Sequence, residues 1–198
     1  MQETVVDLIR HGQPEGGRRY RGHAIDDPLS EEGWVSMWQA IGEHAPWDIV
    51  ISSPLQRCHA FALAVANQQD LPLFVETDLK EVGFGHWEGQ SPQQIQKNKL
   101  AEYEAFYRDP VNCRPEGAEP LDGFIQRVTQ AYQHIIQHQA GKHCLVVTHA
   151  GVIRVIVAYI LQAPPVAMYR MQVSNAGVTR IRHNKYGAQL EFHNGRLS

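Results

Sequence analysis

The chain has 198 residues, of which 43% are hydrophobic, and a formal net charge of −3 with a pI near 6.4. This length favours one domain with a single buried core. The mild acidity argues against a general nucleic-acid-binding protein, which is usually basic. Positive charge is nevertheless concentrated between Arg10 and Arg21, where four arginines stand against one acid, Glu15. A basic segment in an acidic chain favours a small anionic ligand over a polyanion.

Cysteine usage and hydropathy favour a soluble, cytoplasmic protein without a membrane partner. Cys58, Cys113 and Cys144 are widely separated and form no CxxC pair, so we expect neither a disulfide framework nor a cysteine zinc site. The amino terminus has no charged leader followed by an apolar stretch. The longest apolar run, residues 152–161, contains Arg154 and is too short to cross a bilayer. The sequence leaves the oligomeric state open, a homodimer included.

Three short runs rich in β-branched residues predict buried parallel strands, at residues 4–9, 48–51 and 144–148. Apolar residues recur at helical spacing between these runs, at residues 55–65 and 121–136. Strands that alternate with helices predict an α/β fold, in which helices cover both faces of a mostly parallel sheet.

Other segments complete the predicted single domain over residues 1–198. Ser52-Ser53-Pro54 predicts a helix start, with a serine cap and proline at the first helical position. Residues 82–120 are richer in Gly, Pro, Trp and Tyr, and we expect them to form a small cap over the sheet. Residues 171–192 alternate well enough to predict two late strands at an edge of the sheet.

Polar side chains follow each of the three predicted parallel strands. Arg10 and His11 follow the first strand, and His149 follows the third. The helix after the second strand carries Arg57. Ligands of open α/β sheets bind beyond the carboxyl ends of the strands, so these side chains should meet near two helix N-termini, which favour anions. The sequence therefore predicts a phosphate site.

The residue types in this site suit phosphoryl transfer. Arginine neutralises phosphoryl oxygens with a planar, permanent charge, and a neutral imidazole flanked by arginines can attack phosphorus. A second histidine can hydrogen-bond the phosphoryl oxygens, and a carboxylic acid must protonate the leaving alkoxide. Glu81, among apolar and glycine neighbours, is one candidate for this acid, and Glu88 is its rival. The residue pattern alone leaves that choice nearly even.

The segment from Leu8 to Gly12 resembles the Arg-His-Gly signature of the histidine phosphatase superfamily, also called the phosphoglycerate mutase-like family. An isolated Arg-His-Gly triplet would be weak evidence. The resemblance continues in family order to about residue 160, and its further blocks stand at residues 27–30, 52–57, 79–89 and 147–154. Blocks in this order are specific to the family.

The resemblance implies a phosphoric monoester hydrolase that works through a phosphohistidine. It implies that His11 is phosphorylated and that Arg10, Arg57 and His149 form the phosphate pocket. It also implies that Glu81 protonates the leaving alcohol, because Glu81 matches the acid of the family's Leu-x-Glu block.

We expect neither a metal nor another cofactor. Arg10 and Arg57 would repel a divalent cation from a site built on His11 and His149. A second histidine pair, at positions 134 and 138, has a spacing that can bind zinc, but the sequence shows no third ligand nearby. A polar outer helix face accounts for this pair.

The loop at residues 14–22 departs from the family pattern and reduces the range of candidate substrates. Many members carry Trp-Asn where this chain has Gly16-Gly17, and that Asn contacts phosphate. Arg19 or Arg21 could replace the contact, and with Gly22 they are candidate substrate-binding residues. The loop resembles the branch that contains the α-ribazole-5′-phosphate phosphatases of cobalamin synthesis, which implies a small phosphorylated substrate.

Several alternatives remain open at this point. A phosphosugar phosphatase or a phosphoglycerate mutase-type phosphotransferase would use the same pocket, although the family's glycolytic mutases carry a longer cap insertion. A metallohydrolase would use the two histidines as ligands. A non-catalytic phosphate-binding protein belongs to a different class, but such members usually lack one of the residues named above.

Overall fold

The β-branched runs form adjacent parallel strands in the middle of one sheet. β1 (Thr4–Arg10) pairs with β4 (His143–Thr148), and β4 pairs with β2 (Ile49–Ser52). β3 (Leu73–Val75) extends the sheet beside β2, again in parallel. This computed structural model describes residues 3–43 and 46–197, so the ends of the predicted 1–198 unit lie outside the description.

The late strands form an antiparallel hairpin at the other edge, which confirms the predicted pair. β5 (Val178–Asn184) pairs with β1, β6 (Gly187–Gly195) pairs with β5, and the sheet order is β3-β2-β4-β1-β5-β6. The pair begins later than predicted. Residues 171–177 instead form a loop across the end of β1, where the backbone of Arg10 bonds with that of Ala176 and Gly177.

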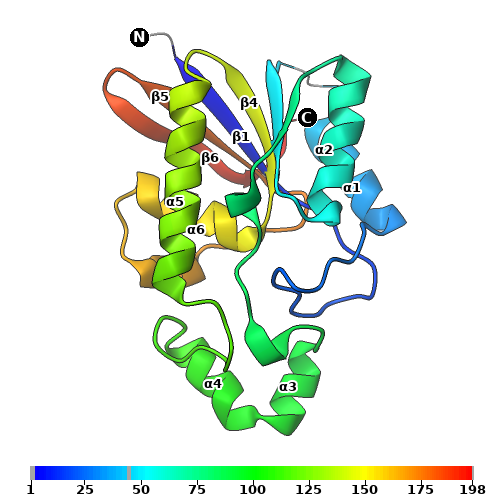
Figure 1. Ribbon diagram of the computed structural model, residues 1–198, viewed down its shortest axis with the longest axis vertical. Coiled ribbons are helices and arrows are strands. Elements are labelled where there is room, and N and C mark those ends of the chain that lie inside the picture. Colours follow the sequence, from blue (N-terminus) through cyan, green and yellow to red (C-terminus); the bar gives the residue numbers. More distant parts are fainter. Residues whose placement is uncertain (1–2, 44–45, 198) are drawn as a thin grey trace.

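Helices cover both faces of the sheet, as predicted. They are α1 (Glu31–Ile41), α2 (Gln56–Gln69), α5 (Leu121–His138) and α6 (Ala150–Ile160). Alternate strand residues face the two layers: Val6 and Leu8 pack in the core with α5 and α6, whereas Ile9 packs in the core with α1 and α2. Figure 1 shows α5 on one side of the sheet and α1 and α2 on the other. No described helix has the length and apolarity needed to cross a membrane.

The predicted helix start at Ser52-Ser53-Pro54 is wrong by two residues. α2 begins at Gln56, and the capping position before it is Leu55, whose side chain accepts no hydrogen bond. The hydroxyl of Ser53 instead lies 2.7 Å from Nε2 of His149. This serine therefore binds the loop after β4, and its hydroxyl also accepts from the backbone amide of Leu55 at 3.3 Å.

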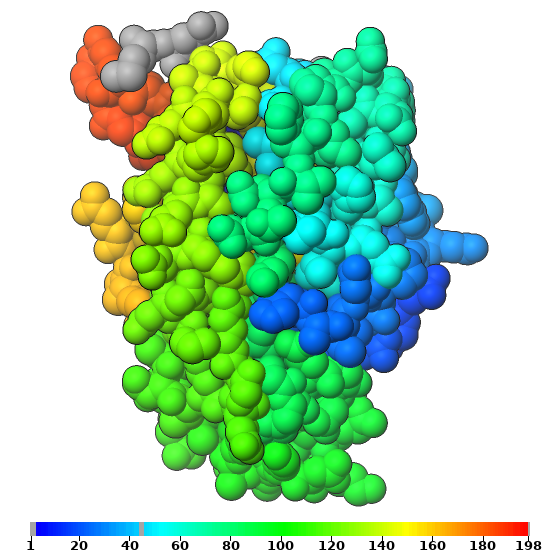
Figure 2. Space-filling view, viewed as in Figure 1, coloured from blue at the N-terminus to red at the C-terminus, as the bar shows by residue number. Residues whose placement is uncertain are grey.

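The cap segment, residues 82–120, lies beyond the end of the sheet, at the bottom of Figure 1. It contains η2 (Gly85–Trp87), α3 (Pro92–Asn98) and α4 (Leu100–Arg108), and Ser91 begins α3 with a capping box. Its own apolar cluster is built on Trp87, Ile95 and Phe106, and Tyr20 of the N-terminal loop packs against that cluster. In the space-filling view the blue N-terminal loop lies directly above the green cap segment (Figure 2).

Candidate active site

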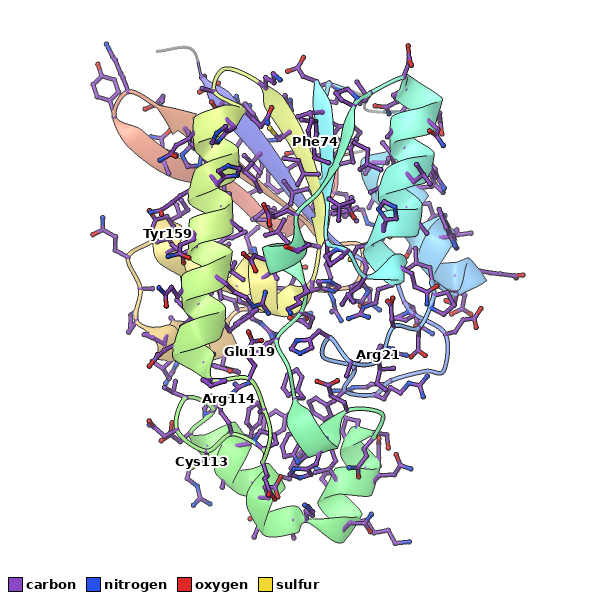
Figure 3. All side chains as sticks on the ribbon, viewed as in Figure 1. Arg21, Phe74, Cys113, Arg114, Glu119 and Tyr159 are labelled. Atoms are coloured by element: carbon purple, nitrogen blue, oxygen red, sulfur yellow. The ribbon has the colours of Figure 1, made fainter. Side chains whose placement is uncertain are left out.

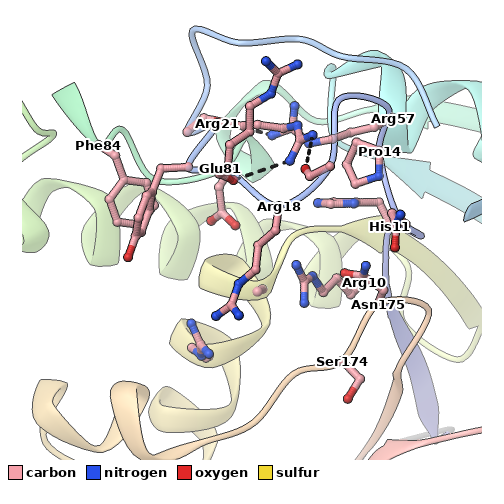
Figure 4. Close-up of a pocket in the computed structure, with 17 residues that line it drawn as sticks. Arg10, His11, Pro14, Arg18, Arg21, Arg57, Glu81, Phe84, Ser174 and Asn175 are labelled. Atoms are coloured by element: carbon pink, nitrogen blue, oxygen red, sulfur yellow. Dashed lines mark hydrogen bonds between the residues drawn. The ribbon is translucent and has the colours of Figure 1, made fainter. Parts of the chain in front are cut away.

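A cavity of about 680 Å³ opens where the loops after β1 and β2 meet the start of α6 and the cap segment. Figure 4 shows Arg10, His11 and Arg57 on one side of it and Glu81 and Phe84 on the other. The residues predicted from the sequence that line the cavity are Arg10, His11, Arg19, Arg21, Gly22, Arg57 and Glu81.

His11 stands at the end of β1 with a defined ring orientation. Its Nδ1 lies 2.7 Å from the carbonyl oxygen of Gly12, and its own backbone amide bonds to Thr148 of β4. The side chain is 5% exposed. Burial, reinforced by the positive charges of Arg10 and Arg57, holds the pKa of His11 well below its usual value. The imidazole is therefore neutral, as a nitrogen nucleophile must be.

Arg57 is buried, Arg10 is partly buried, and both guanidinium groups are incompletely bonded. Arg10 donates to the carbonyl of Val173 at 2.6 Å, and Arg57 donates to those of Ile25 at 3.0 Å and Gly22 at 2.8 Å. The Nε atoms of both arginines have no hydrogen-bond partner among the residues described. Burial lowers the pKa of Arg10 to about 10, which still leaves it charged at neutral pH. Two cations with unused donors, one buried and one partly buried, favour an anionic ligand.

His149 lies behind His11 rather than on the cavity wall. The two ring centroids are 5.2 Å apart, but Nε2 of His149 faces the Ser53 hydroxyl, and Cys58 Sγ lies 3.7 Å from its Nδ1. The ring is fully buried, and burial together with the charge of Arg57 lowers its pKa well below the usual value. Its role as a phosphate ligand stays a prediction. Sequence reasoning missed Ser53 as its partner.

Glu81 reaches the N-terminus of α6 from a segment that follows β3. Its carboxylate accepts from the backbone amide of Gly151 at 3.1 Å and from that of Val82 at 3.0 Å. A Cβ atom on Gly151 would lie 2.3 Å from Oε1 of Glu81, so only glycine permits this approach. Glu81 thus lines the cavity across from His11 (Figure 4).

Glu88, the rival acid, holds two loops together and does not line the cavity. Its carboxylate accepts from the backbone amide of Ala24 at 2.9 Å and from that of Phe84 at 2.8 Å. These bonds join the N-terminal loop to the cap segment. The geometry therefore favours Glu81 over Glu88, a choice that the residue pattern alone could not make.

Arg19 and Arg21 reach the cavity, but one carboxylate binds them both. Oδ2 of Asp27 lies 2.7 Å from Nη2 of Arg19 and 2.7 Å from Nε of Arg21. Arg21 also donates to the carbonyls of Glu15 and Gly17, which closes the loop on itself. Both arginines therefore hold the loop in shape, and their direct contact with substrate stays a prediction. Gly22 contributes its carbonyl to Arg57.

Arg18 is the arginine of this loop that has no bonding partner among the residues described. It follows Gly16 and Gly17, whose φ angles of 76° and 72° form a left-handed turn that favours glycine. Figure 4 shows its side chain extending across the cavity toward α6. Its guanidinium forms no ion pair or hydrogen bond with residues 3–43 or 46–197. Asp27 was the signal in the sequence that could have distinguished Arg18, because its carboxylate pairs with Arg19 and Arg21.

Two further features concern the cavity wall and the possible metal site on α5. Arg154 of α6 lines the cavity beside Ser174 and Asn175, and its Nε donates to the carbonyl of Met171 at 3.1 Å. The rings of His134 and His138 are 3.9 Å apart on an exposed face of α5, and no third described His, Cys, Asp or Glu completes a metal-binding group with them.

The chain is similar to known proteins in both sequence and fold. The family model of the histidine phosphatase superfamily (branch 1) matches residues 6–196. An adenosylcobalamin/α-ribazole phosphatase from Escherichia coli (strain K12) is 29% identical over 96% of this chain and 95% of its own. A metal-independent phosphoserine phosphatase from Arabidopsis thaliana is 28% identical over 92% of this chain and 79% of its own. The crystal structure of the α-ribazole phosphatase from Shigella flexneri superposes with a TM-score of 0.84 at 26% identity, over 97% of this chain and 96% of the other. The chain is therefore a phosphatase that belongs to branch 1 of the histidine phosphatase superfamily.

Proposed function

We propose that the protein hydrolyses a small phosphomonoester in two steps through a phosphohistidine on His11. In the first step Nε2 attacks phosphorus, Arg10 and Arg57 neutralise the phosphoryl oxygens, and Glu81 gives its proton to the leaving alcohol. In the second step Glu81 takes a proton from water, the water oxygen bonds to phosphorus, and the bond to Nε2 breaks. Inorganic phosphate leaves, and His11 and Glu81 return to their starting states.

The observation that carries this proposal is the free nitrogen of His11. Its Nδ1–H group donates a hydrogen bond to the Gly12 carbonyl, so Nε2 keeps a lone pair. Two arginines with unused donors, Arg10 and Arg57, lie beside it. Glu81 stands on the opposite cavity wall (Figure 4). The proposed nucleophile, the two arginines and the proposed acid thus line one cavity, which has room for a phosphoryl group.

For the substrate, α-ribazole-5′-phosphate is the first candidate. The Escherichia coli and Shigella flexneri relatives carry this activity in their names. The cavity, about 680 Å³, falls within the roughly 300–1,000 Å³ of small-molecule sites. Tyr20 and Phe84 give its wall two aromatic rings, and Arg18 adds a planar cation, which suit a nucleoside-like leaving group.

The intermediate is tested by rapid mixing with ³²P-labelled substrate, followed by a quench. We expect an acid-labile, base-stable phosphate on His11, absent from His11→Ala and present in His138→Ala, a control on an exposed helix face. Label on another residue, or wild-type turnover by His11→Ala, would remove the mechanism. EDTA should leave the rate unchanged and vanadate should inhibit. A rate restored only by added zinc or magnesium would favour the metallohydrolase alternative.

The substrate is tested separately, by kcat/KM on α-ribazole-5′-phosphate, phosphoserine, a phosphosugar and 3-phosphoglycerate. We expect the first compound to be the best substrate. A tenfold preference for any of the others would overturn the substrate assignment and leave the phosphohistidine chemistry standing. Return of the phosphoryl group to a second alcohol, in place of water, would indicate a mutase.

A further inference from the structure

The segment that carries Glu81 is held in place by side chains from other elements. The Glu81 strap, residues 78–83, runs from the short helix η1 (Thr77–Leu79) into the first residues of the cap segment. Thr148 donates to the carbonyl of Leu79 at 3.1 Å, and Nδ1 of His23 donates to that of Glu81 at 3.1 Å. Three further bonds to strap carbonyls come from one residue of α5, Arg127.

Arg127 uses all five of its N–H donors. Nη1 donates to the carbonyls of Asp78 at 2.5 Å and Lys80 at 2.9 Å, and Nη2 donates to that of Glu81 at 3.2 Å. Nε and Nη2 bind the two carboxylate oxygens of Glu119 at 2.7 and 2.9 Å. Together with Thr148, Arg127 thus binds every carbonyl from residue 78 to residue 81.

Glu119 fixes both the guanidinium and the far end of the strap. Its Oε2 also accepts from the backbone amide of Gly83 at 3.1 Å. Arg114 donates to the carbonyls of Glu119 at 3.1 Å and Gly83 at 3.3 Å. Figure 3 places Glu119 and Arg114 where the chain passes between α5 and the cap segment. The Glu119 carboxylate therefore joins Arg127 to the strap from the other side.

Arg127 acts at a distance from the cavity. It lies behind the strap, its side chain is 14% exposed, and its guanidinium lies 4.8 Å from the ring centroid of Phe124. It is absent from the cavity lining, whereas Glu81 is part of it. Arg127 therefore does not touch a ligand in the cavity, and its bonds to the strap act on the position of Glu81.

We propose that Arg127, oriented by Glu119, is the positioning residue for the acid Glu81. It fixes the strap so that the Glu81 carboxyl group meets the Gly151 amide and faces the leaving oxygen. This rests on the proposed function, because it presupposes that Glu81 is the proton donor. Misplacement of a catalytic group by about 1 Å can cost on the order of a hundredfold in rate.

The experiment compares Arg127→Met and Glu81→Gln, singly and combined, on an alkyl phosphate and on p-nitrophenyl phosphate. Methionine keeps the apolar stem of the side chain and removes every donor. We expect Arg127→Met to lower kcat on the alkyl phosphate by about a hundredfold, to affect nitrophenyl transfer much less, and to leave KM nearly unchanged. The double variant should equal Glu81→Gln, because nothing is left to position. Arg182→Met, at an exposed ion pair on β5, is the matched control.

Two outcomes would overturn the positioning role. One is an equal loss by Arg127→Met in the rate of phosphoryl transfer to His11 from both substrates, and the other is a further loss when it is added to Glu81→Gln. If Arg127→Met does not fold, Glu119→Gln should show the same leaving-group dependence with a smaller amplitude. If Glu81→Gln itself shows no leaving-group dependence, the acid assignment fails and the positioning role fails with it. If Glu81→Gln shows it and the other variants do not, only the positioning role fails.

Discussion

Nδ1 of His11 lies 2.7 Å from the carbonyl oxygen of Gly12, its neighbour in the chain. A carbonyl oxygen only accepts hydrogen bonds, so Nδ1 carries the ring hydrogen and Nε2 keeps its lone pair. Burial and two neighbouring arginines hold the pKa of this ring well below its usual value. Acid therefore protonates the nucleophile only at a pH far below neutrality.

The first prediction is that His11 takes up its proton at a pH well below that of an ordinary histidine. An ordinary histidine takes up its proton near pH 6.5, and a lowered pKa moves that event to more acid solution. The measurement is the NMR shift of the His11 Cε1–H group, assigned by its loss in His11→Asn. A midpoint near pH 6.5 would contradict the electrostatic description of the site.

The second prediction separates Glu81 from Glu88 as the acid. An alkoxide needs a proton far more than a nitrophenolate does, and loss of a general acid costs about a hundred- to ten-thousand-fold. Glu81→Gln should therefore greatly slow turnover of an alkyl phosphate and affect nitrophenyl transfer to His11 much less. Since Glu81 also activates water in the proposed mechanism, p-nitrophenyl phosphate should show a burst followed by a slow steady state.

Glu88→Gln is the matched comparison. Its carboxylate binds the backbone amides of Ala24 and Phe84, so its loss should weaken folding or substrate binding without any dependence on the leaving group. Thermal unfolding and KM measure those two effects. If the two variants exchange behaviours, Glu88 is the acid.

The third prediction concerns Arg18, whose guanidinium spans the cavity without a partner in the described part of the chain. A hydrogen bond to a charged group is worth about 1.5–3 kcal/mol when buried, and this side chain is exposed. We therefore expect Arg18→Ala to raise KM for α-ribazole-5′-phosphate by about tenfold and to change kcat little. Arg19→Ala, which removes an ion pair with Asp27, should lower thermal stability more than substrate affinity. A larger KM effect from Arg19→Ala would show that the two roles are reversed.

The fourth prediction concerns Asp7, a fully buried carboxylate in the middle of β1. Burial alone would raise its pKa, but hydrogen bonds from His143, Arg180 and Trp47 outweigh burial and lower the pKa of Asp7 to about 2. A carboxylate with a lowered folded-state pKa adds stability above its unfolded pKa of about 3.9. That stability, about 2 kcal/mol, is lost as pH falls from about 5 toward 2.

Urea unfolding of Asp7→Asn at pH 7 and pH 3 measures this effect. At pH 7 the variant removes the buried carboxylate that Arg180 and His143 bind, and loss of one member of a buried ion pair costs about 3–5 kcal/mol. At pH 3 the difference from the wild-type protein should shrink, because the wild-type carboxyl group itself begins to take up a proton. Asp122→Asn, at an exposed position on α5, is the control. An equal difference at both pH values would contradict the assignment.

The parallel core of the fold was predictable because its signals are local. The β-branched runs at residues 4–9, 48–51 and 144–148 predict buried parallel strands. The three strands lie next to one another in the sheet. The start of α2 was not predictable from Ser53 and Pro54. The Ser53 hydroxyl faces a histidine 96 residues later in the chain, and no local pattern records that contact.

The candidate site shows the same division between local and distant information. The sequence predicted that Arg10, His11 and Arg57 meet beyond the carboxyl ends of the strands, because residues that follow parallel strands lie together there. All three line the cavity. The choice between Glu81 and Glu88 depends on which carboxylate reaches the amide of Gly151, 70 residues away from Glu81. Such contacts between distant segments exist only in the folded chain.

Tyr20 belongs both to the cavity wall and to the aromatic cluster of the cap segment. Its hydroxyl lies 2.7 Å from that of Tyr107 on α4, and its ring packs 5.0 Å from those of Trp87 and Phe84. Mutations in α4 can therefore reshape the wall that meets the leaving group while His11 and its arginines stay untouched. Descendants of one ancestral enzyme can in this way acquire new substrates by drift in the cap segment alone, with the phosphorus chemistry inherited intact.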